Sequence, residues 1–249
     1  VEYGKENKYD DDIFFQKYSQ MSRSQQGLAG AGEWETLRKL LPDFKDKRVL
    51  DLGCGYGWHC IYAMEHGASS VVGVDISHKM LEVAKEKTHF PQVEYKCCAI
   101  EDVEFPEESF DVILSSLAFH YVADYEILVK KIYRILKSGG KLVFTVEHPV
   151  FTAYGTQDWY YNEKGEILHF PVDNYYYEGK RTAVFLGEKV TKFHRTLTTY
   201  LNTLLSNGFI INHIVEPQPP ENMMDIPGMQ DEMRRPMMLI VSANKKVDR

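Results

Sequence analysis

The chain has 249 residues, of which 44% are hydrophobic and 26% charged, as is ordinary for a globular protein with a substantial core. Its formal net charge of −7 argues against a nucleic-acid partner, because binding to a phosphate backbone depends on clustered lysine and arginine. No apolar run approaches the roughly 20 residues that span a bilayer, so no membrane partner is expected.

The cysteines and the first residues indicate a cellular compartment. Cys54, Cys60, Cys97 and Cys98 form no CxxC pair and no cysteine–histidine spacing of a zinc site. We therefore expect no metal and interpret the thiols as reduced and largely buried. The opening stretch, VEYGKENKYDDD, is acidic and polar and shows no secretory signal. Together these features predict a cytoplasmic protein.

Segments of helix and strand type alternate along the first 147 residues. In chain order we expect an amphipathic helix in DIFFQKYSQMSRS, a helix at EWETLRKLL, a strand at KRVLDLG, a helix at YGWHCIYAMEHG, a strand at SVVGVD, a helix capped by Ser77, strands at VEYKC and FDVILS, a helix at ILVKKIYRILK closed by Ser138-Gly139-Gly140, and a strand at KLVFTVE. Apolar strands that alternate with helices indicate a parallel sheet covered by helices.

The alternation stops after Glu147. From His148 to Lys192, 45 residues precede the next clear helix, and nine of the 27 residues from Phe151 to Tyr177 are aromatic. A segment of this length is expected to form a cap. Two further strands, FIINHIVE and MMLIVSA, are expected to pair at a sheet edge. The prediction is a doubly wound, Rossmann-like α/β fold with a seven-stranded, mostly parallel sheet, an antiparallel last strand pair, and an aromatic-rich cap insertion after strand 5.

The stretch VLDLGCGYGWHC places three glycines where the first strand passes into its helix. Ligands of open parallel sheets bind beyond the carboxyl ends of the strands, where glycines let them approach the backbone N–H groups. The GxGxG spacing differs from the GxGxxG of dinucleotide folds, and Asp51 precedes the first glycine by two residues. Asp75 ends the second strand, where an acid can accept both hydroxyls of a ribose or simply cap the next helix.

Four stretches together resemble the class I S-adenosylmethionine (SAM)-dependent methyltransferases: DLGCGYG, VVGVDIS, AIEDVEFPEESFDVILSSLAFHYV and LKSGGKLVFTVEHP. The pattern is most similar to bacterial small-molecule enzymes of the ubiquinone/menaquinone-biosynthesis type. The resemblance covers the chain from Trp34 to Pro149 and implies an enzyme that uses SAM and releases S-adenosylhomocysteine (SAH). It also implies a lid in residues 1–32 and a methyltransferase domain in residues 33–249, with the cap insertion at 148–192.

The resemblance implies roles for residues along the strand ends. The methionine end of SAM would be held by Asp51, Gly53, Cys54, Gly55, Gly57, Ser115 and, from the lid, Tyr18. The ribose and adenine would be held by Asp75, Ile76, Ile100 and Glu101. Many relatives carry an aspartate where this chain has Ala99, so Glu101 or a backbone carbonyl is expected to receive the adenine amino group. Losing one such hydrogen bond costs about 0.5–1.5 kcal/mol.

Methyl transfer from a sulfonium is an in-line displacement, in which the protein mainly orients the reactants and excludes water. A general base is needed only when the nucleophile arrives protonated. Four residues near the expected acceptor rim are candidates for catalysis: His120, Glu147, His148 and His194. Each also has a structural interpretation, as a cap or packing residue. Arg195, at a helix start, either binds a substrate carboxylate or forms a solvated or salt-bridged surface group.

The aromatic insertion has two equal interpretations, a cage for a cationic or planar acceptor and a small core or dimer contact of its own. The favoured function is methyl transfer from SAM to nitrogen or oxygen of a small-molecule acceptor, in a possible homodimer. One alternative is a nucleic-acid base methyltransferase, although Ser115-Ser116-Leu117-Ala118 stands where such enzymes carry an Asn/Asp-Pro-Pro-aromatic motif. A SAM- or SAH-binding protein without transferase activity is a second, and an NAD-dependent oxidoreductase, which the GxGxG spacing disfavours, is a third.

Overall fold

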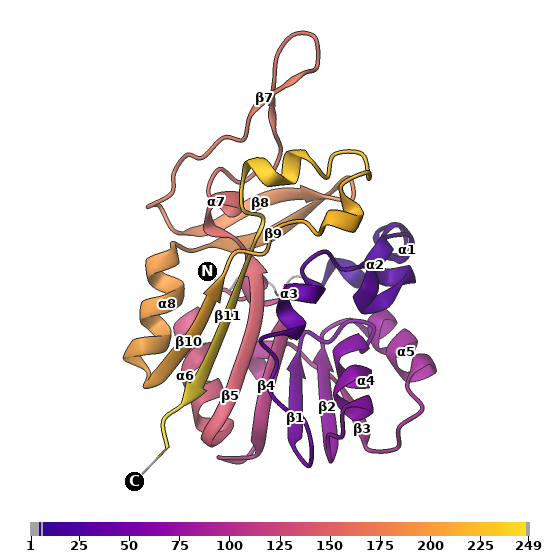
Figure 1. The fold of residues 1–249 in the computed structure, drawn as a ribbon, viewed down its shortest axis with the longest axis vertical. Helices are drawn as coiled ribbons and strands as arrows, with labels where there is room; N and C mark the ends of the chain where they lie inside the picture. The colour runs from indigo at the N-terminus through magenta and orange to yellow at the C-terminus, as the bar shows by residue number, and fades with distance from the viewer. Residues whose placement is uncertain (1–4, 6, 248–249) are drawn as a thin grey trace.

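A seven-stranded sheet forms the centre of the computed structural model, which describes residues 5 and 7–247 (Figure 1). Its strands are β1 (Arg48–Leu52), β2 (Ser70–Asp75), β3 (Val93–Cys97), β4 (Phe110–Ser116), β5 (Leu136–Glu147), β10 (Phe209–Val215) and β11 (Met238–Lys245). The strand order is β10-β11-β5-β4-β1-β2-β3, and β11 runs antiparallel to both β10 and β5 while the other neighbours are parallel. The predicted fold, with its antiparallel last strand pair, is confirmed.

Helices cover both faces of this sheet. They are α3 (Trp34–Arg38), α4 (Trp58–Glu65), α5 (His78–Lys87), α6 (Tyr125–Ile135) and α8 (Leu197–Ser206). Short 3-10 turns lie in the connections after β3, β4 and β10: η3 (Ile100–Asp102), η4 (Phe119–Tyr121), η5 (Glu221–Met223) and η6 (Asp231–Arg234). Val49 and Leu50, adjacent on β1, belong to two different buried apolar clusters, one on each side of the sheet. Strands buried on both faces explain the continuous apolar runs in the sequence.

Side-chain caps set several helix starts. The Ser77 hydroxyl accepts a hydrogen bond from the Met80 N–H at 3.2 Å, as the sequence predicts for α5. Asp124 caps α6 in the same way. The expected end of α6 was wrong: the helix stops at Ile135, and Leu136 already pairs with Phe110 as the first residue of β5. Leu136 is fully buried in the core, and this burial outweighs the helical propensity of the segment.

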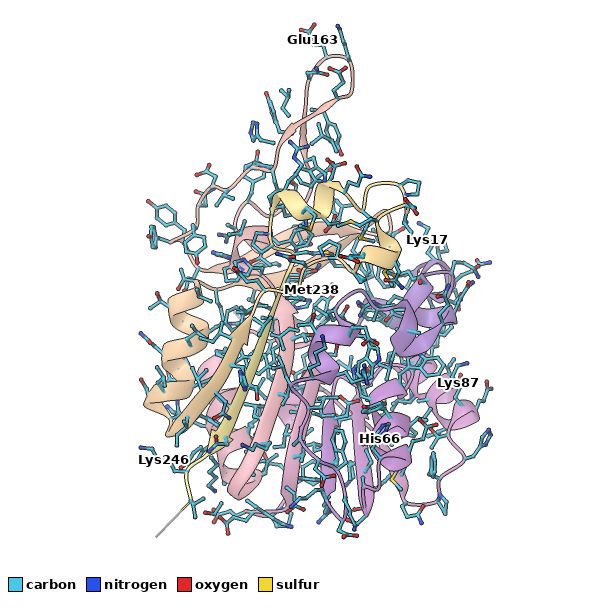
Figure 2. All side chains as sticks on the ribbon, viewed as in Figure 1. Lys17, His66, Lys87, Glu163, Met238 and Lys246 are labelled. Carbon is cyan, nitrogen blue, oxygen red and sulfur yellow. The ribbon has the colours of Figure 1, made fainter. Side chains whose placement is uncertain are left out.

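Two segments lie over the carboxyl ends of the central strands (Figure 1). One is the N-terminal segment with η1 (Lys8–Asp10), α1 (Asp12–Ser19), α2 (Ser22–Gln25) and η2 (Gly27–Gly30). The other follows β5 and contains α7 (Pro149–Thr152), the short pair β6 (Tyr160–Tyr161) and β7 (Ile167–His169), and the hairpin of β8 (Gly179–Phe185) and β9 (Glu188–His194). The β6–β7 pair projects from the body, with Glu163 at its far end (Figure 2).

The part of the lid expectation that falls on residues 1–4 and 6 lies outside the described residues, as do residues 248–249. Within the described part, the N-terminal segment is tied to the domain by hydrogen bonds. The Asp10 carboxylate accepts from the Ser77 hydroxyl at 2.6 Å and from the Lys79 N–H at 3.1 Å. None of the described helices is both long and apolar enough to cross a membrane.

Candidate active site

A cavity of about 220 Å³ lies at the carboxyl ends of β1, β2, β4 and β5, beneath the N-terminal segment and the β8–β9 hairpin. Its walls come from the glycine loop, the ends of β2 and β4, η3 and η4, and both covering segments. They include Tyr9, Tyr18, Arg23, Gly53, Gly55, Asp75, Ile76, Ile100, Glu101, Ser116, Leu117, His120, Tyr121, Glu147, Phe185 and Lys192. The cavity therefore reaches from the glycine loop to the cap.

The three loop glycines all have positive φ, but for different reasons. A Cβ at Gly53 would lie 2.4 Å from the Ala118 Cβ, and one at Gly57 would lie 2.2 Å from the Tyr95 hydroxyl. At Gly55 nothing lies within 4 Å of such an atom. Gly53 and Gly57 are thus required by packing as well as by φ, whereas Gly55 presents open backbone to the cavity that it lines.

Asp75 holds the glycine loop and lines the same cavity. Its Oδ2 accepts from the Gly55 N–H at 2.8 Å, and its Oδ1 accepts from the Ser77 N–H at 2.9 Å. Burial raises the pKa of this carboxyl above its ordinary value, against the lowering effect of these backbone donors. Each carboxylate oxygen keeps a further acceptor position, so the pair can receive the two hydroxyls of a ribose.

Asp51 lies beneath the loop and not on the cavity wall. It is 1% exposed, its Oδ2 lies 3.5 Å from the Cys60 thiol that donates to it, and its Oδ1 has no hydrogen-bond partner among the described residues. Burial raises the pKa of Asp51 to about 7. A buried acid with an unused oxygen, next to a loop open to the cavity, fits a cationic group such as the methionine ammonium of SAM. Cys54 is buried beside it.

Of the remaining residues that were expected to bind the cofactor, some line the cavity and one lies in the hydrophobic core. Ile76, Ile100 and Glu101 line the cavity, and the Glu101 carbonyl already accepts from the Lys131 ammonium at 2.7 Å. The Ser115 hydroxyl instead donates to the Leu52 carbonyl at 2.7 Å within the core. The next residue, Ser116, lines the cavity, because successive side chains on a strand point to opposite faces.

From the N-terminal segment, Tyr18 lines the cavity and packs edge-on against Tyr9 and Tyr56. Arg23 lines it as well and forms a two-pronged ion pair with Glu33, at 3.0 and 2.9 Å. Sequence reasoning missed Tyr9 and Arg23 as wall residues, although their place in the expected lid was a signal for them.

His120 lines the cavity and is 2% exposed. Its Nδ1 accepts from the Glu147 N–H at 3.4 Å. Burial lowers the pKa of His120 to about 4; the Glu147 carboxylate opposes this shift, while Lys192 and Arg195 reinforce it. The imidazole is therefore neutral near pH 7.

Glu147 lines the cavity beside His120 but is not a free base. Its Oε1 accepts from the Lys192 ammonium at 2.5 Å, and its Oε2 accepts from the Gln157 amide at 2.5 Å. Burial alone would raise the pKa of Glu147, but His120, Lys192 and Gln157 hold it below its usual value. Lys192 is 2% exposed and also lines the cavity. Sequence reasoning missed this lysine, which lay at the end of the expected insertion.

The other two candidate histidines do not line the cavity. His148 caps α7, with its Nδ1 accepting from the Val150 N–H at 3.0 Å and its Nε2 2.8 Å from a Glu216 carboxylate oxygen. His194 is fully buried, and its ring nitrogens lie 2.7 Å from the Thr152 hydroxyl and 2.8 Å from the Tyr175 carbonyl. Both rings thus serve the cap structure.

Arg195 is neither a surface group nor open to the cavity. It is 5% exposed and donates to backbone carbonyls of Phe119, Val122, Ala123 and Phe193. These carbonyls, most of which lie in or just after η4, are the partner that a positive charge at a helix start requires.

Three aromatic rings of the insertion surround the guanidinium of Arg235. The Arg235 guanidinium lies 4.7 Å from the centre of the Phe151 ring, 5.1 Å from that of Trp159 and 4.9 Å from that of Phe170. Glu232 pairs with the same guanidinium at 2.5 Å. These three rings therefore form a small core around an internal cation and do not form a cage open to an acceptor.

The sheet is Rossmann-like, with Gly55 exposing its backbone after β1 and Asp75 at the end of β2. This architecture is typical of enzymes that bind a nucleoside-containing cofactor. Residues 50–144 match the methyltransferase domain family. Across the described residues, no group of three or more histidine, cysteine, aspartate or glutamate side chains is arranged to hold a metal ion.

Similar proteins extend this match over most of the chain. A Listeria monocytogenes protein of known structure, assigned as a SAM-dependent methyltransferase, is 58% identical with a TM-score of 0.85, covering 88% of this chain and 99% of its own. A SAM-dependent methyltransferase from Mesorhizobium loti is 40% identical with a TM-score of 0.81, covering 88% of this chain and all of its own. The ubiquinone biosynthesis O-methyltransferase of Coxiella burnetii is 36% identical over 112 residues, which are 44% of this chain and 47% of that enzyme.

The chain belongs to the class I SAM-dependent methyltransferases. It is an enzyme, and its methyl donor is SAM. When bound, SAM supplies a methyl group activated by the positive charge of its sulfur.

Proposed function

We propose that this enzyme transfers the methyl group to a nitrogen or oxygen of a small-molecule acceptor. The observation that carries the proposal is that one cavity joins the expected cofactor residues to a second set of polar side chains. Asp75 and Gly55 line one part of it, and His120, Glu147 and Lys192 line another. Both segments above the strand ends contribute walls, so donor and acceptor would meet away from bulk water.

In this proposal the chain binds and orients both reactants. Asp75 would receive the ribose hydroxyls, Ile76 and Ile100 would flank the adenine, and Asp51 would face the methionine ammonium through the glycine loop. Tyr18 would close the cavity over the methionine end. The C. burnetii relative, an O-methyltransferase, matches over 44% of this chain, so it supports the donor more than the acceptor.

The test combines calorimetry with an acceptor screen. SAH should bind to the purified chain, and NAD at millimolar concentration should not. A screen of amines, phenols and quinone precursors with SAM should yield a methylated small molecule, detected by mass spectrometry together with SAH. Binding of NAD without binding of SAH would contradict the proposal, and methylation confined to oligonucleotides would replace the acceptor class.

A further inference from the structure

At one end of the cavity, Lys192 and His120 each carry an N–H without a hydrogen-bond acceptor among the described residues; the Lys192 ammonium also lies 5.8 and 5.4 Å from the centres of the Tyr121 and Phe185 rings. Lys192 has three ammonium N–H groups, of which Glu147 and Gln157 take two, at 2.5 and 2.8 Å. His120 uses its Nδ1 as an acceptor, and its Nε2 forms no hydrogen bond within the described part of the chain. Both side chains line the cavity and are 2% exposed, so a ligand there is the available partner for the two donors.

The hydrogen bond at Nδ1 decides what His120 can do. The Glu147 N–H donates to Nδ1, so this nitrogen carries a lone pair. Because burial keeps the ring neutral, with a pKa of about 4, the single ring proton must be on Nε2. His120 in this state presents a donor to the cavity and cannot take a proton through Nε2. It suits an oxygen atom with lone pairs and not an ammonium or amine N–H.

The buried charges around His120 favour an anion. They are the Glu147 carboxylate from β5, the Lys192 ammonium from β9 and the Arg195 guanidinium that follows β9; Tyr121 packs on the ring from η4. Arg195 is bound by backbone carbonyls, and no carboxylate within residues 5 and 7–247 forms an ion pair with it. Glu147 therefore offsets one of these two positive charges, which leaves one more positive than negative charge in the immediate surroundings of His120.

The same carboxylate has no free oxygen for a cationic acceptor. Its Oε1 and Oε2 are held by Lys192 and Gln157 at 2.5 Å each. The neighbouring walls are the rings of Tyr9, Tyr121 and Phe185, and the hydroxyls of the two tyrosines lie 3.4 Å apart. Planar walls beside two donors suit an aromatic or enolic oxygen compound.

We propose that the acceptor is a planar phenol or enol that reacts as its oxyanion, held between Nε2 of His120 and Nζ of Lys192; this assignment rests on the proposed function. The hydroxyl proton leaves to solvent as the oxyanion is bound. A lone pair of the oxyanion forms the new O–C bond to the methyl carbon, and the S–C bond breaks with its electron pair going to sulfur. The products are a neutral methyl ether and the neutral thioether SAH, and no protein base takes part.

The test uses 4-nitrophenol and 4-nitrocatechol as optical probes, titrated with pH on the enzyme saturated with SAH. Ionised probe has its own visible absorbance, so the apparent pKa of the bound probe is read directly, without turnover. We expect bound probe to ionise at lower pH than free probe. A hydrogen bond to a charged group contributes about 10- to 100-fold to binding, so His120→Phe should weaken binding of the ionised probe by that factor. His120→Gln, which can place an N–H near the position of Nε2, should restore most of it.

A matched pair of variants isolates the lysine charge. Glu147→Gln removes the neutralising carboxylate and should lower the apparent pKa of the bound probe further. Glu147→Gln/Lys192→Met differs from it only by the ammonium and should return that pKa toward the value of free probe. Calorimetry with SAH verifies that each variant is folded and binds the cofactor product.

The outcomes separate the two proposals. Failure of SAH to bind the unaltered chain would overturn the proposed function itself. Normal SAH binding with an unshifted or raised probe pKa, or with amines methylated in preference to phenols, would overturn the oxyanion assignment alone. The assignment would also fail if the two Glu147 variants bound the ionised probe equally well.

Discussion

The two halves of the cavity are built in different ways. The proposed cofactor half consists mainly of residues at strand ends, with Tyr18 and Arg23 added from the N-terminal segment, and part of it is backbone, as at Gly55. The proposed acceptor half brings together His120 from η4, Glu147 from β5 and Lys192 from β9, and the last two are 45 positions apart in the sequence. One half therefore depends on a local motif, whereas the other exists only when the β8–β9 hairpin packs on the sheet.

Buried carboxylates show the same contrast. Asp51 has a thiol as its one hydrogen-bond donor within the described chain, and burial raises its pKa to about 7. Glu147 is also buried, yet an ammonium and an amide hold its pKa below the usual value. The proposed cofactor half thus contains a buried acid without a cationic partner among the described residues, whereas in the proposed acceptor half the acid is paired with Lys192.

The largest effect is expected where the two halves differ most, in the buried ion pair. Lys192→Met leaves Glu147 buried without its cation, and this should lower the free energy of unfolding by about 3–5 kcal/mol. Adding Glu147→Gln removes the unpaired charge and should recover most of the loss. Denaturant unfolding of the single and double variants measures both changes; equal losses in the two would show that the pair does not determine the stability of the cap.

In the cofactor half, Asp75→Ala should affect binding most. It removes both proposed ribose contacts and the acceptor that holds the Gly55 N–H, so SAH should bind about 100-fold more weakly. Glu163→Ala, at the tip of the projecting β6–β7 pair, is the matched control and should leave the affinity unchanged (Figure 2). Calorimetry checks both; an unaltered affinity in Asp75→Ala would remove the ribose assignment.

The unpaired acid predicts a pH dependence. The pKa of Asp51 is about 7 in the folded chain against an ordinary value of 3.8, so the folded state keeps a proton between these values that the unfolded state has lost. Stability from this group is present below pH 3.8 and is lost as pH rises to about 7, by up to about 1.4 kcal/mol per pH unit.

Asp51→Asn should remove this contribution, so its unfolding free energy should decline less than that of the unaltered chain as pH rises from the acidic range to neutrality. Denaturant titrations at several pH values compare the two chains. Parallel pH profiles would mean that Asp51 is ionised in the folded protein.

The smallest effect is expected at His148, which lies outside the cavity. His148→Ala removes the side-chain acceptor at the start of α7 and should cost about 1 kcal/mol of stability. Binding of SAH and of the nitrophenol probes should not change. A changed probe affinity would bring His148 back into the acceptor site and would weaken the division between the two halves.

Much of the cofactor half was readable from single segments. The glycine spacing, Asp75 at its strand end and the alternation of elements each express a local rule, and the sheet order follows from the fold class that they indicate. Ser115 was predicted to line the cavity, but a local pattern cannot tell which of two adjacent strand residues does so. The packing of the strand against the elements above it determines this. Ser116 holds that position.

The residues of the proposed acceptor half were much harder to predict, because they are distant from one another in the sequence and belong to residue types that occur at many other positions. Glu147 and His120 stood out by their place after strands, but nothing local distinguished Lys192 from the other lysines of the insertion. Likewise, the aromatic run could not show that Phe151, Trp159 and Phe170 pack around Arg235, more than sixty residues further on.

By itself, the sequence determined the alternation of strands and helices through its periodicity, and the resemblance of four short stretches to SAM-dependent methyltransferases implied the class of this protein and its donor. Only the tertiary structure brought together the residues of the proposed acceptor site. The charge state of Glu147, the tautomer of His120 and the use of Arg195 depend on which buried groups meet across the cavity. When such groups are buried together, their interactions shift pKa values and require each polar atom to have a hydrogen-bond partner. These effects cannot be predicted from any one segment alone.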